Sequence, residues 1–266
     1  MKKPVLIWLL LLNLACSKDS YSDNGDNLTT ISLPTALELS YNGGEQEVIY
    51  ELSYNQENQI NQVSIERSSD GDTTQLLANF NYNQNGTLVE VTGTSDAEQF
   101  QMVFSYNQDT IISDIDFNIG GDETNLDVLY DEIQNSYLVT YVNLNLPLSF
   151  TFDEQNRLSL IGVQENSITP SYLDFDKGVF HDVNLQPANH IWNGLFFFLA
   201  PWELYFLSER DVTRFDIENP SNPTESSNYQ SKLRDGNGNL IAFQLRFGVF
   251  GSLLIDYLIT YENRTF

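Results

Sequence analysis

An aromatic residue followed by Asn or Asp returns at nearly even spacing along most of this chain. The aromatic residue stands at positions 54, 82, 106, 130, 152 and 175, so successive copies are 28, 24, 24, 22 and 23 residues apart. Two polar residues follow the pair, often with Asn or Gly, and Leu or Ile comes shortly afterwards. An even period of this kind is typical of a structural unit that repeats and stacks.

Each repeat has the pattern of one β-hairpin. In the stretch 52–65, apolar and polar residues alternate up to Tyr54, a polar Asn/Gln/Glu cluster breaks the run, and apolar residues resume at Ile60. A period of about 24 residues holds two strands and two short turns. The sequence therefore predicts an all-β fold, a long antiparallel meander of about 24-residue hairpin repeats. Because so many twisted strands must curl to protect their edges, we expect the meander to curve into a barrel or half-barrel.

One segment departs from the repeat. Residues 191–207, IWNGLFFFLAPWELYFL, are apolar on every side but are interrupted by polar residues, Gly and Pro. The segment is short for a bilayer span, so we expect one short helical or apolar element near 191–207 that packs against the sheet. Trp192 and Trp202 are candidates for lining a ligand pocket there, and simple burial of both indoles is the alternative.

The N-terminus has the pattern of a lipoprotein signal. Lys2 and Lys3 precede an apolar run, and Ala15 stands before Cys16, the single cysteine of the chain. This arrangement resembles the lipobox of bacterial lipoproteins, in which the cysteine is lipidated and becomes the first residue. We therefore expect a signal peptide over 1–15, a lipidated Cys16 with a flexible polar tether over 16–30, and a single β-repeat domain over 31–266. An ordinary secretory signal is the alternative.

Charge and cysteine content exclude several classes of function. The formal net charge is −25, which disfavours binding to nucleic acid because the phosphate backbone is also anionic. With one cysteine, no disulfide forms within the chain. If Cys16 is lipidated, palmitate or a similar acyl chain holds the protein to the membrane, since each buried CH₂ contributes about 0.8 kcal/mol. We expect the outer membrane, at its surface-exposed or its periplasmic face.

Candidate sites for chemistry are few. His181 and His190 are the only histidines, and the sequence has no zinc-protease or serine-hydrolase motif, so we expect structural roles for both. Asp235, Asn237 and Asn239 place oxygen side chains at alternate positions, as a calcium loop does, although a hairpin turn explains the same pattern. We expect no other metal or cofactor. The 37 acidic residues nominate no catalytic pair for glycoside hydrolysis.

The repeats resemble YD-type repeats related to Rhs proteins, as they occur in uncharacterised lipoproteins of Bacteroidota. The units at 54, 82, 106 and 152 carry the resemblance, together with 175–183 and the turn at 235–240, and it covers about 45–266. The group includes a domain of unknown function described as porin-like in fold. The resemblance implies a curved β-sheet and assigns no activity.

These observations predict a lipid-anchored outer-membrane or cell-surface protein that serves as a non-enzymatic binding or structural module. A glycan or an envelope protein is the expected partner, besides the membrane itself. Two alternatives stay open. One is a periplasmic carrier that shelters an apolar ligand beneath the 191–207 segment, and the other is a glycosidase-like enzyme.

Overall fold

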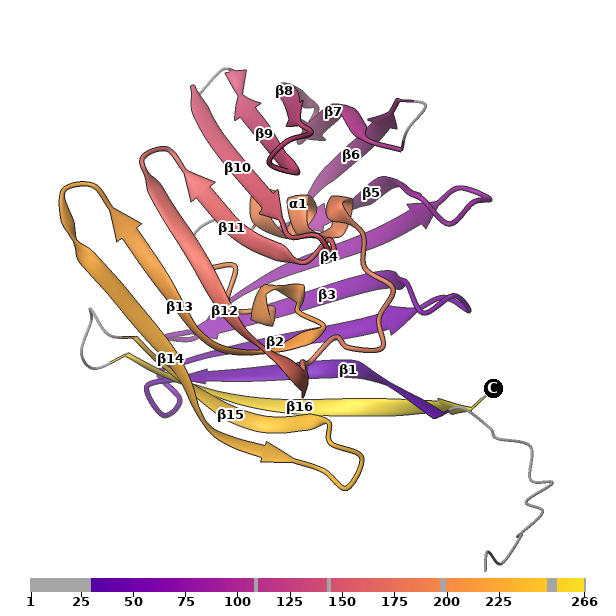
Figure 1. Cartoon of the computed structure of the whole chain (residues 1–266). Helices are drawn as coiled ribbons and strands as arrows, with labels where there is room; N and C mark the ends of the chain where they lie inside the picture. Colours follow the sequence, from indigo (N-terminus) through magenta and orange to yellow (C-terminus); the bar gives the residue numbers. More distant parts are fainter. Residues whose placement is uncertain (1–29, 108–109, 143–144, 197–199, 248–252, 266) are drawn as a thin grey trace, which may run out of the picture.

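The computed structural model describes residues 30–107, 110–142, 145–196, 200–247 and 253–265. Within them, sixteen strands form one closed antiparallel barrel, because β1 pairs with β16 as well as with β2 (Figure 1). The predicted all-β meander is thus confirmed, and it closes into a full barrel. The strands are β1 (Thr30–Tyr41), β2 (Gln46–Tyr54), β3 (Ile60–Ser69), β4 (Asp72–Tyr82), β5 (Leu88–Ser95), β6 (Glu98–Tyr106), β7 (Ile112–Ile119), β8 (Asp122–Asp131), β9 (Ser136–Tyr141), β10 (Leu146–Phe152), β11 (Leu158–Val163), β12 (Asn166–Lys177), β13 (Arg210–Asn219), β14 (Asn222–Arg234), β15 (Leu240–Phe247) and β16 (Leu254–Thr265).

The strands bury their apolar residues toward the inside of the barrel. In β2, Val48, Tyr50 and Leu52 are buried, while the alternate residues Glu47 and Glu51 are exposed. Successive side chains of a strand point to opposite faces, so a two-residue period separates an apolar lumen from a polar outer wall. The hydrophobic core therefore lies inside the barrel.

The Asn or Asp of each repeat builds the turn that follows its strand. The Asn83 side-chain oxygen accepts hydrogen bonds from the backbone N–H groups of Asn85 (2.9 Å) and Thr87 (3.0 Å). Asn55, Asp153 and Asp235 cap their turns with the same pair of bonds. A short side chain that bonds to its own backbone favours a turn over a continued strand. These turns lie at one end of the barrel, which we call the rim.

The aromatic residue of several repeats ties its strand to the preceding one. The hydroxyls of Tyr82 and Tyr106 donate to the carbonyl oxygens of Ile60 (2.8 Å) and Leu88 (2.6 Å), each at the start of the strand before. Tyr54 donates in the same way to Pro34 (2.6 Å). Each such bond contributes about 1 kcal/mol and satisfies a carbonyl at the end of a ladder.

The predicted repeat at Phe175 is wrong. Phe175 lies within β12 and is 96% exposed, and no hairpin turn follows it. Strands β12 and β13 pair at Leu173 with Asp211 and again at Lys177 with Arg210, so the three residues between form a bulge in β12. A bulge leaves its extra residues out of the ladder and turns them outward, which accounts for the exposed ring.

The chain between β12 and β13 leaves the wall and enters the lumen. Figure 1 shows the helix α1 (Pro187–Phe196) inside the curve of the sheet, and the short 3₁₀ helix η2 (Tyr205–Leu207) follows it. Every residue from Ala188 to Leu195 is buried. The short helical element expected near 191–207 is therefore present, and it fills the barrel from within.

Candidate functional site

Residues 178–196 and 200–209, which we call the plug, cross the lumen and contact opposite walls. The α1 half packs against β4 to β10. Trp192 meets Phe80 edge to face with ring centroids 4.8 Å apart, and Phe196 lies 4.7 Å from Phe100. Gly194 lets the helix approach β10, because a Cβ at that position would lie 2.1 Å from the Phe150 ring.

The second half of the plug packs against β13 to β16. Trp202 stacks on Phe215 with ring centroids 5.4 Å apart, and its carbonyl oxygen accepts a hydrogen bond from the Tyr257 hydroxyl (3.0 Å). The Tyr205 ring lies 5.0 Å from that of Phe243. The space beneath the 191–207 segment is thus filled by aromatic side chains from both halves of the barrel.

Three consecutive plug residues have left-handed backbone. Tyr205, Phe206 and Leu207 have φ of 50°, 57° and 49°, and all three side chains are buried. Residues other than glycine disfavour the left-handed region of φ and ψ. Each residue held there costs on the order of 1 kcal/mol or more, so the surrounding structure must hold it in place. A buried ionic cluster lies on either side of η2 in the chain, one around Glu203 and one around Asp211.

The first cluster surrounds Glu203, whose side chain is 2% exposed. Its carboxylate accepts hydrogen bonds from the Tyr41 and Tyr50 hydroxyls and pairs with the Arg67 guanidinium at 2.6 Å. These partners come from β1, β2 and β3. Burial, together with the Glu203 charge, raises the pKa of Tyr50 well above its usual value, so its hydroxyl stays a donor.

The second cluster surrounds Asp211 at the start of β13, whose side chain is 3% exposed. It pairs with Lys232 and with Arg234 (2.6 Å), both on β14, and accepts a bond from the Tyr205 hydroxyl (2.6 Å). Burial lowers the pKa of Lys232, although Asp211 favours its charged form. The first cluster therefore fastens the plug to β1–β3 through Glu203. The second fastens it to β13 through the bond from Tyr205 to Asp211, which β14 holds in place.

His190 makes the stability of the fold depend on pH. Burial lowers the pKa of His190 to about 4, against about 6.5 in an unfolded chain. The unfolded chain therefore takes up a proton first, and stability that is complete above pH 6.5 is lost as pH falls toward 4. We expect His190 to account for a loss of about 2 kcal/mol between pH 7 and pH 5.

Urea unfolding at the two pH values measures this loss. In a His190→Gln variant, the difference between pH 7 and pH 5 should shrink by about that amount. His181, whose pKa burial also lowers, remains in both proteins and cancels in the comparison. An unchanged pH dependence in the variant would show that His190 is not buried in its neutral form.

The residues singled out in the sequence lie in different places. Cys16 and the predicted segment 1–15 fall outside the described residues. Trp192 is completely buried, and Trp202 is partly buried against the core, so the two belong to opposite halves of the plug. His181 lies 3.0 Å from Asp182, whose carboxylate also accepts a bond from the Ser32 backbone N–H (2.7 Å).

The acidic loop at Asp235 is a rim turn. The Asp235 carboxylate accepts bonds from the backbone N–H groups of Asn237 (2.8 Å) and Asn239 (2.9 Å), and from the Asn239 side-chain amide (2.8 Å). Its oxygens are thus used within the turn. In the part of the chain that the structure describes, no group of three or more His, Cys, Asp or Glu side chains is placed to hold a metal ion.

The residues that hold the plug are not predictable from the sequence pattern, because they lie far apart in the chain. Glu203 is separated from Arg67 by 136 residues, and Lys232 and Arg234 lie more than 20 residues after Asp211. The one sequence feature that could have indicated the first cluster is Glu203, an isolated acid within the apolar segment 191–207. A carboxylate there must find buried partners, because an unpaired buried charge is costly.

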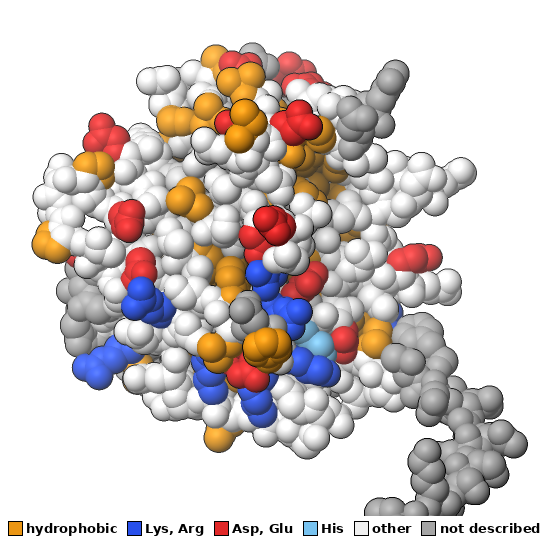
Figure 2. All heavy atoms as spheres, in the orientation of Figure 1, with side chains coloured by type: hydrophobic (Ala, Val, Ile, Leu, Met, Phe, Trp, Pro, Cys, Tyr) orange, Lys and Arg blue, Asp and Glu red, His pale blue; other side chains and the backbone are white. Residues whose placement is uncertain are grey.

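The outer wall carries acidic and neutral polar side chains together with exposed apolar ones, among them Leu129, Leu138 and Leu258. The face drawn in Figure 2 shows scattered acidic side chains, cations gathered in its lower half, and hydrophobic side chains among them. Two hollows at the rim lie beside the first repeat turns, with volumes of about 630 and 870 Å³. A third hollow of about 570 Å³ lies on the outer face of β2–β5 and is lined by Glu51 and Glu66.

Comparison with known proteins identifies the architecture. No family model matches the chain, and no curated protein matches it. A porin-like protein from Bacteroides uniformis has a similar structure, with a TM-score of 0.51 and 11% identity over 86% of this chain and 96% of that one. The fold is that of a porin-like barrel. A second porin-like protein, from Bacteroides vulgatus, aligns with a TM-score of 0.42 and 12% identity over 87% and 99% of the two chains.

Neither α1 nor any other described helix has the length and apolar composition that a bilayer crossing requires.

Proposed function

We propose that this protein is a lipid-anchored protein of the bacterial outer membrane that acts as a non-enzymatic binding module through the outside of its barrel. The filled lumen carries this proposal. Aromatic side chains of the plug occupy the interior, and Glu203 and Asp211 fasten the plug to the wall. A barrel filled in this way presents its outer wall and its rim to a partner.

The distribution of polarity supports the same proposal. Strands that cross an outer membrane have apolar residues facing lipid and polar residues facing the lumen. Here Tyr50 and Leu52 face inward, whereas Glu47, Glu51 and other acids face outward. Acidic outer faces favour water around the barrel, so attachment to the membrane falls to the lipid on Cys16.

The N-terminal sequence supports a location in the bacterial envelope. The lipobox-like signal before Cys16 and the resemblance to YD-type repeats of Bacteroidota lipoproteins support lipidation and export. The similar structure from Bacteroides uniformis is described as a porin-like protein, which fits a protein of the envelope. A glycan or an envelope protein is the partner that this setting favours.

Labelling with palmitate and membrane fractionation test the anchor. We expect wild-type protein to incorporate the label and to sediment with outer membranes, and Cys16→Ala to lose the label and appear in the soluble fraction. Ser17→Ala is the matched control and should behave as wild type. Unlabelled Cys16→Ala protein that stays in the membrane after carbonate extraction would show that the barrel itself is embedded.

A further inference from the structure

We propose that the rim hollow between the first two repeat turns binds a neutral oligosaccharide. This inference deepens the proposed function, because it assigns a ligand class to the binding module. The hollow has a volume of about 630 Å³ and lies between the β2–β3 turn and the β4–β5 turn, where the plug passes beneath. Its lining residues are Asn55, Glu57, Gln59, Tyr82, Asn83, Gln84, Asn85, Gly86, Thr87, Asn184 and Gln186.

Hydrogen bonds hold the floor of the hollow. The side-chain amides of Gln59 and Gln186 both donate to the Gly86 carbonyl, at 2.6 and 2.5 Å, and the Gln186 side-chain oxygen accepts a bond from the Leu88 N–H (3.0 Å). The Asn184 N–H donates to the Asn58 carbonyl (3.0 Å). These bonds join two turns and the plug in one network. A site held in advance loses less conformational entropy when a ligand binds.

The walls present free amide groups. Gln84, Asn85 and Asn184 are exposed, and within the described residues their side chains have no hydrogen-bond partner. An amide offers two donors and one acceptor oxygen without net charge. A sugar hydroxyl is likewise a donor and an acceptor, so a row of hydroxyls matches these walls. Glu57 is the charged residue of this lining and would repel an anionic ligand, and an apolar peptide would need apolar pockets.

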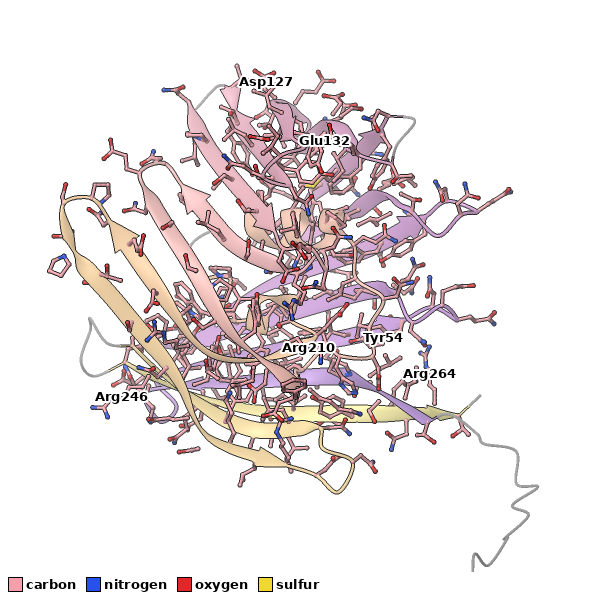
Figure 3. All side chains as sticks on the ribbon, in the orientation of Figure 1. Tyr54, Asp127, Glu132, Arg210, Arg246 and Arg264 are labelled. Carbon is pink, nitrogen blue, oxygen red and sulfur yellow. The ribbon has the colours of Figure 1, made fainter. Side chains whose placement is uncertain are left out.

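A second hollow adjoins the first. It has a volume of about 870 Å³, shares Asn55 and Glu57 with the first and continues to Tyr54 and Arg264. Figure 3 shows Tyr54 and Arg264 close together at this end of the barrel, and the Arg264 guanidinium donates to the Tyr54 carbonyl (3.2 Å). The continuous surface favours a chain of sugars over a single ring.

The position of Asn85 allows a matched test. Asn85 is the third residue of the Asn83–Gly86 turn, and its backbone N–H is held by Asn83. Asn237 occupies the equivalent place in the Asp235–Gly238 turn, where its N–H is held by Asp235, but it does not line the hollow. Asn85→Ala and Asn237→Ala thus remove the same group from turns of the same construction.

The test is calorimetric titration of the full lipidated protein, purified in a detergent without sugar, with neutral linear hexasaccharides of glucose, mannose and xylose. We expect at least one to bind, Asn85→Ala to weaken its affinity at least fivefold, and Asn237→Ala to change it less than twofold. A hexasaccharide of galacturonate should bind more weakly than the neutral chain.

Three results would overturn the proposal. The first is no heat of binding from any neutral chain at millimolar concentration, the second is equal weakening by Asn85→Ala and Asn237→Ala, and the third is tighter binding of the galacturonate chain. The anchor is measured separately by the palmitate label on Cys16. Failure of sugar binding with a labelled Cys16 refutes the ligand class alone, whereas an unlabelled protein that binds sugar refutes the anchor alone.

Discussion

Replacement of Trp192 by Ala should lower the free energy of unfolding by about 3 to 5 kcal/mol. The indole is completely buried at the centre of the α1 half of the plug, with the Phe80 ring 4.8 Å away and the Phe196 ring 5.7 Å away. Truncation removes the transfer energy of the ring and leaves a cavity that a closed barrel wall cannot collapse to fill.

Urea unfolding followed by far-ultraviolet circular dichroism measures this loss. Leu129→Ala is the matched control, because Leu129 lies on the outer wall and is 66% exposed, so its truncation should cost less than about 0.5 kcal/mol. If Trp192→Ala unfolds at the same urea concentration as Leu129→Ala, packing of the plug does not contribute to the free energy of unfolding of the barrel.

Replacement of Asp211 by Ala should be equally damaging, for an electrostatic reason. Asp211 pairs with Lys232 and Arg234, and it accepts the Tyr205 hydroxyl that anchors η2. Its removal takes from Lys232 and Arg234, both largely buried, the carboxylate that pairs with them, and loss of one partner from a buried ionic group costs about 3 to 5 kcal/mol. Thermal unfolding should show the loss, with a lower midpoint than wild type.

Asp216→Ala provides the comparison on the same strand. Asp216 pairs with Arg214 at 2.9 Å and accepts a hydrogen bond from the Ser226 hydroxyl. Because the Arg214 side chain is 52% exposed, water replaces the lost ion pair, and the cost should be about 1 kcal/mol. Equal midpoints for the two variants would mean that the Asp211 cluster does not hold the plug in place.

The repeat predicted much of the wall, because each hairpin is local. The pairs at Tyr54, Tyr82 and Tyr106 mark the ends of β2, β4 and β6, and the turn that follows each pair is formed by residues within four positions of the Asn. Such short-range information is present in a single sequence. The buried apolar element in the second half of the chain was predicted for the same reason.

Features that depend on distant contacts could not be predicted. Closure requires β1 to pair with β16, and nothing in either strand specifies the other. The partners of Glu203 come from three strands more than 130 residues away. At Phe175 the local pattern gave a wrong prediction. The pair Phe175-Asp176 has the sequence of a repeat, but it lies in a bulged strand and no hairpin turn follows it.

The rim hollow depends on local turn sequences and also on contacts between residues far apart in the chain. Its walls come from Gln84 and Asn85, turn residues that the repeat pattern marks, while its floor depends on Gln186 from the plug, 100 residues from its partner Gly86. A turn-rich sequence predicts polar loops. Only the fold shows that two of those loops and the plug share one surface.

A filled barrel requires the plug to be part of the hydrophobic core. Hydrogen exchange of the backbone amides of α1 measures this, since amides in a cooperative core exchange only through global unfolding. We predict that peptides covering 187–196 are protected to the same free energy as peptides from β2 and β15. Exchange of these amides within seconds, while the strands stay protected, would show that the plug leaves the lumen in solution and would contradict the filled barrel.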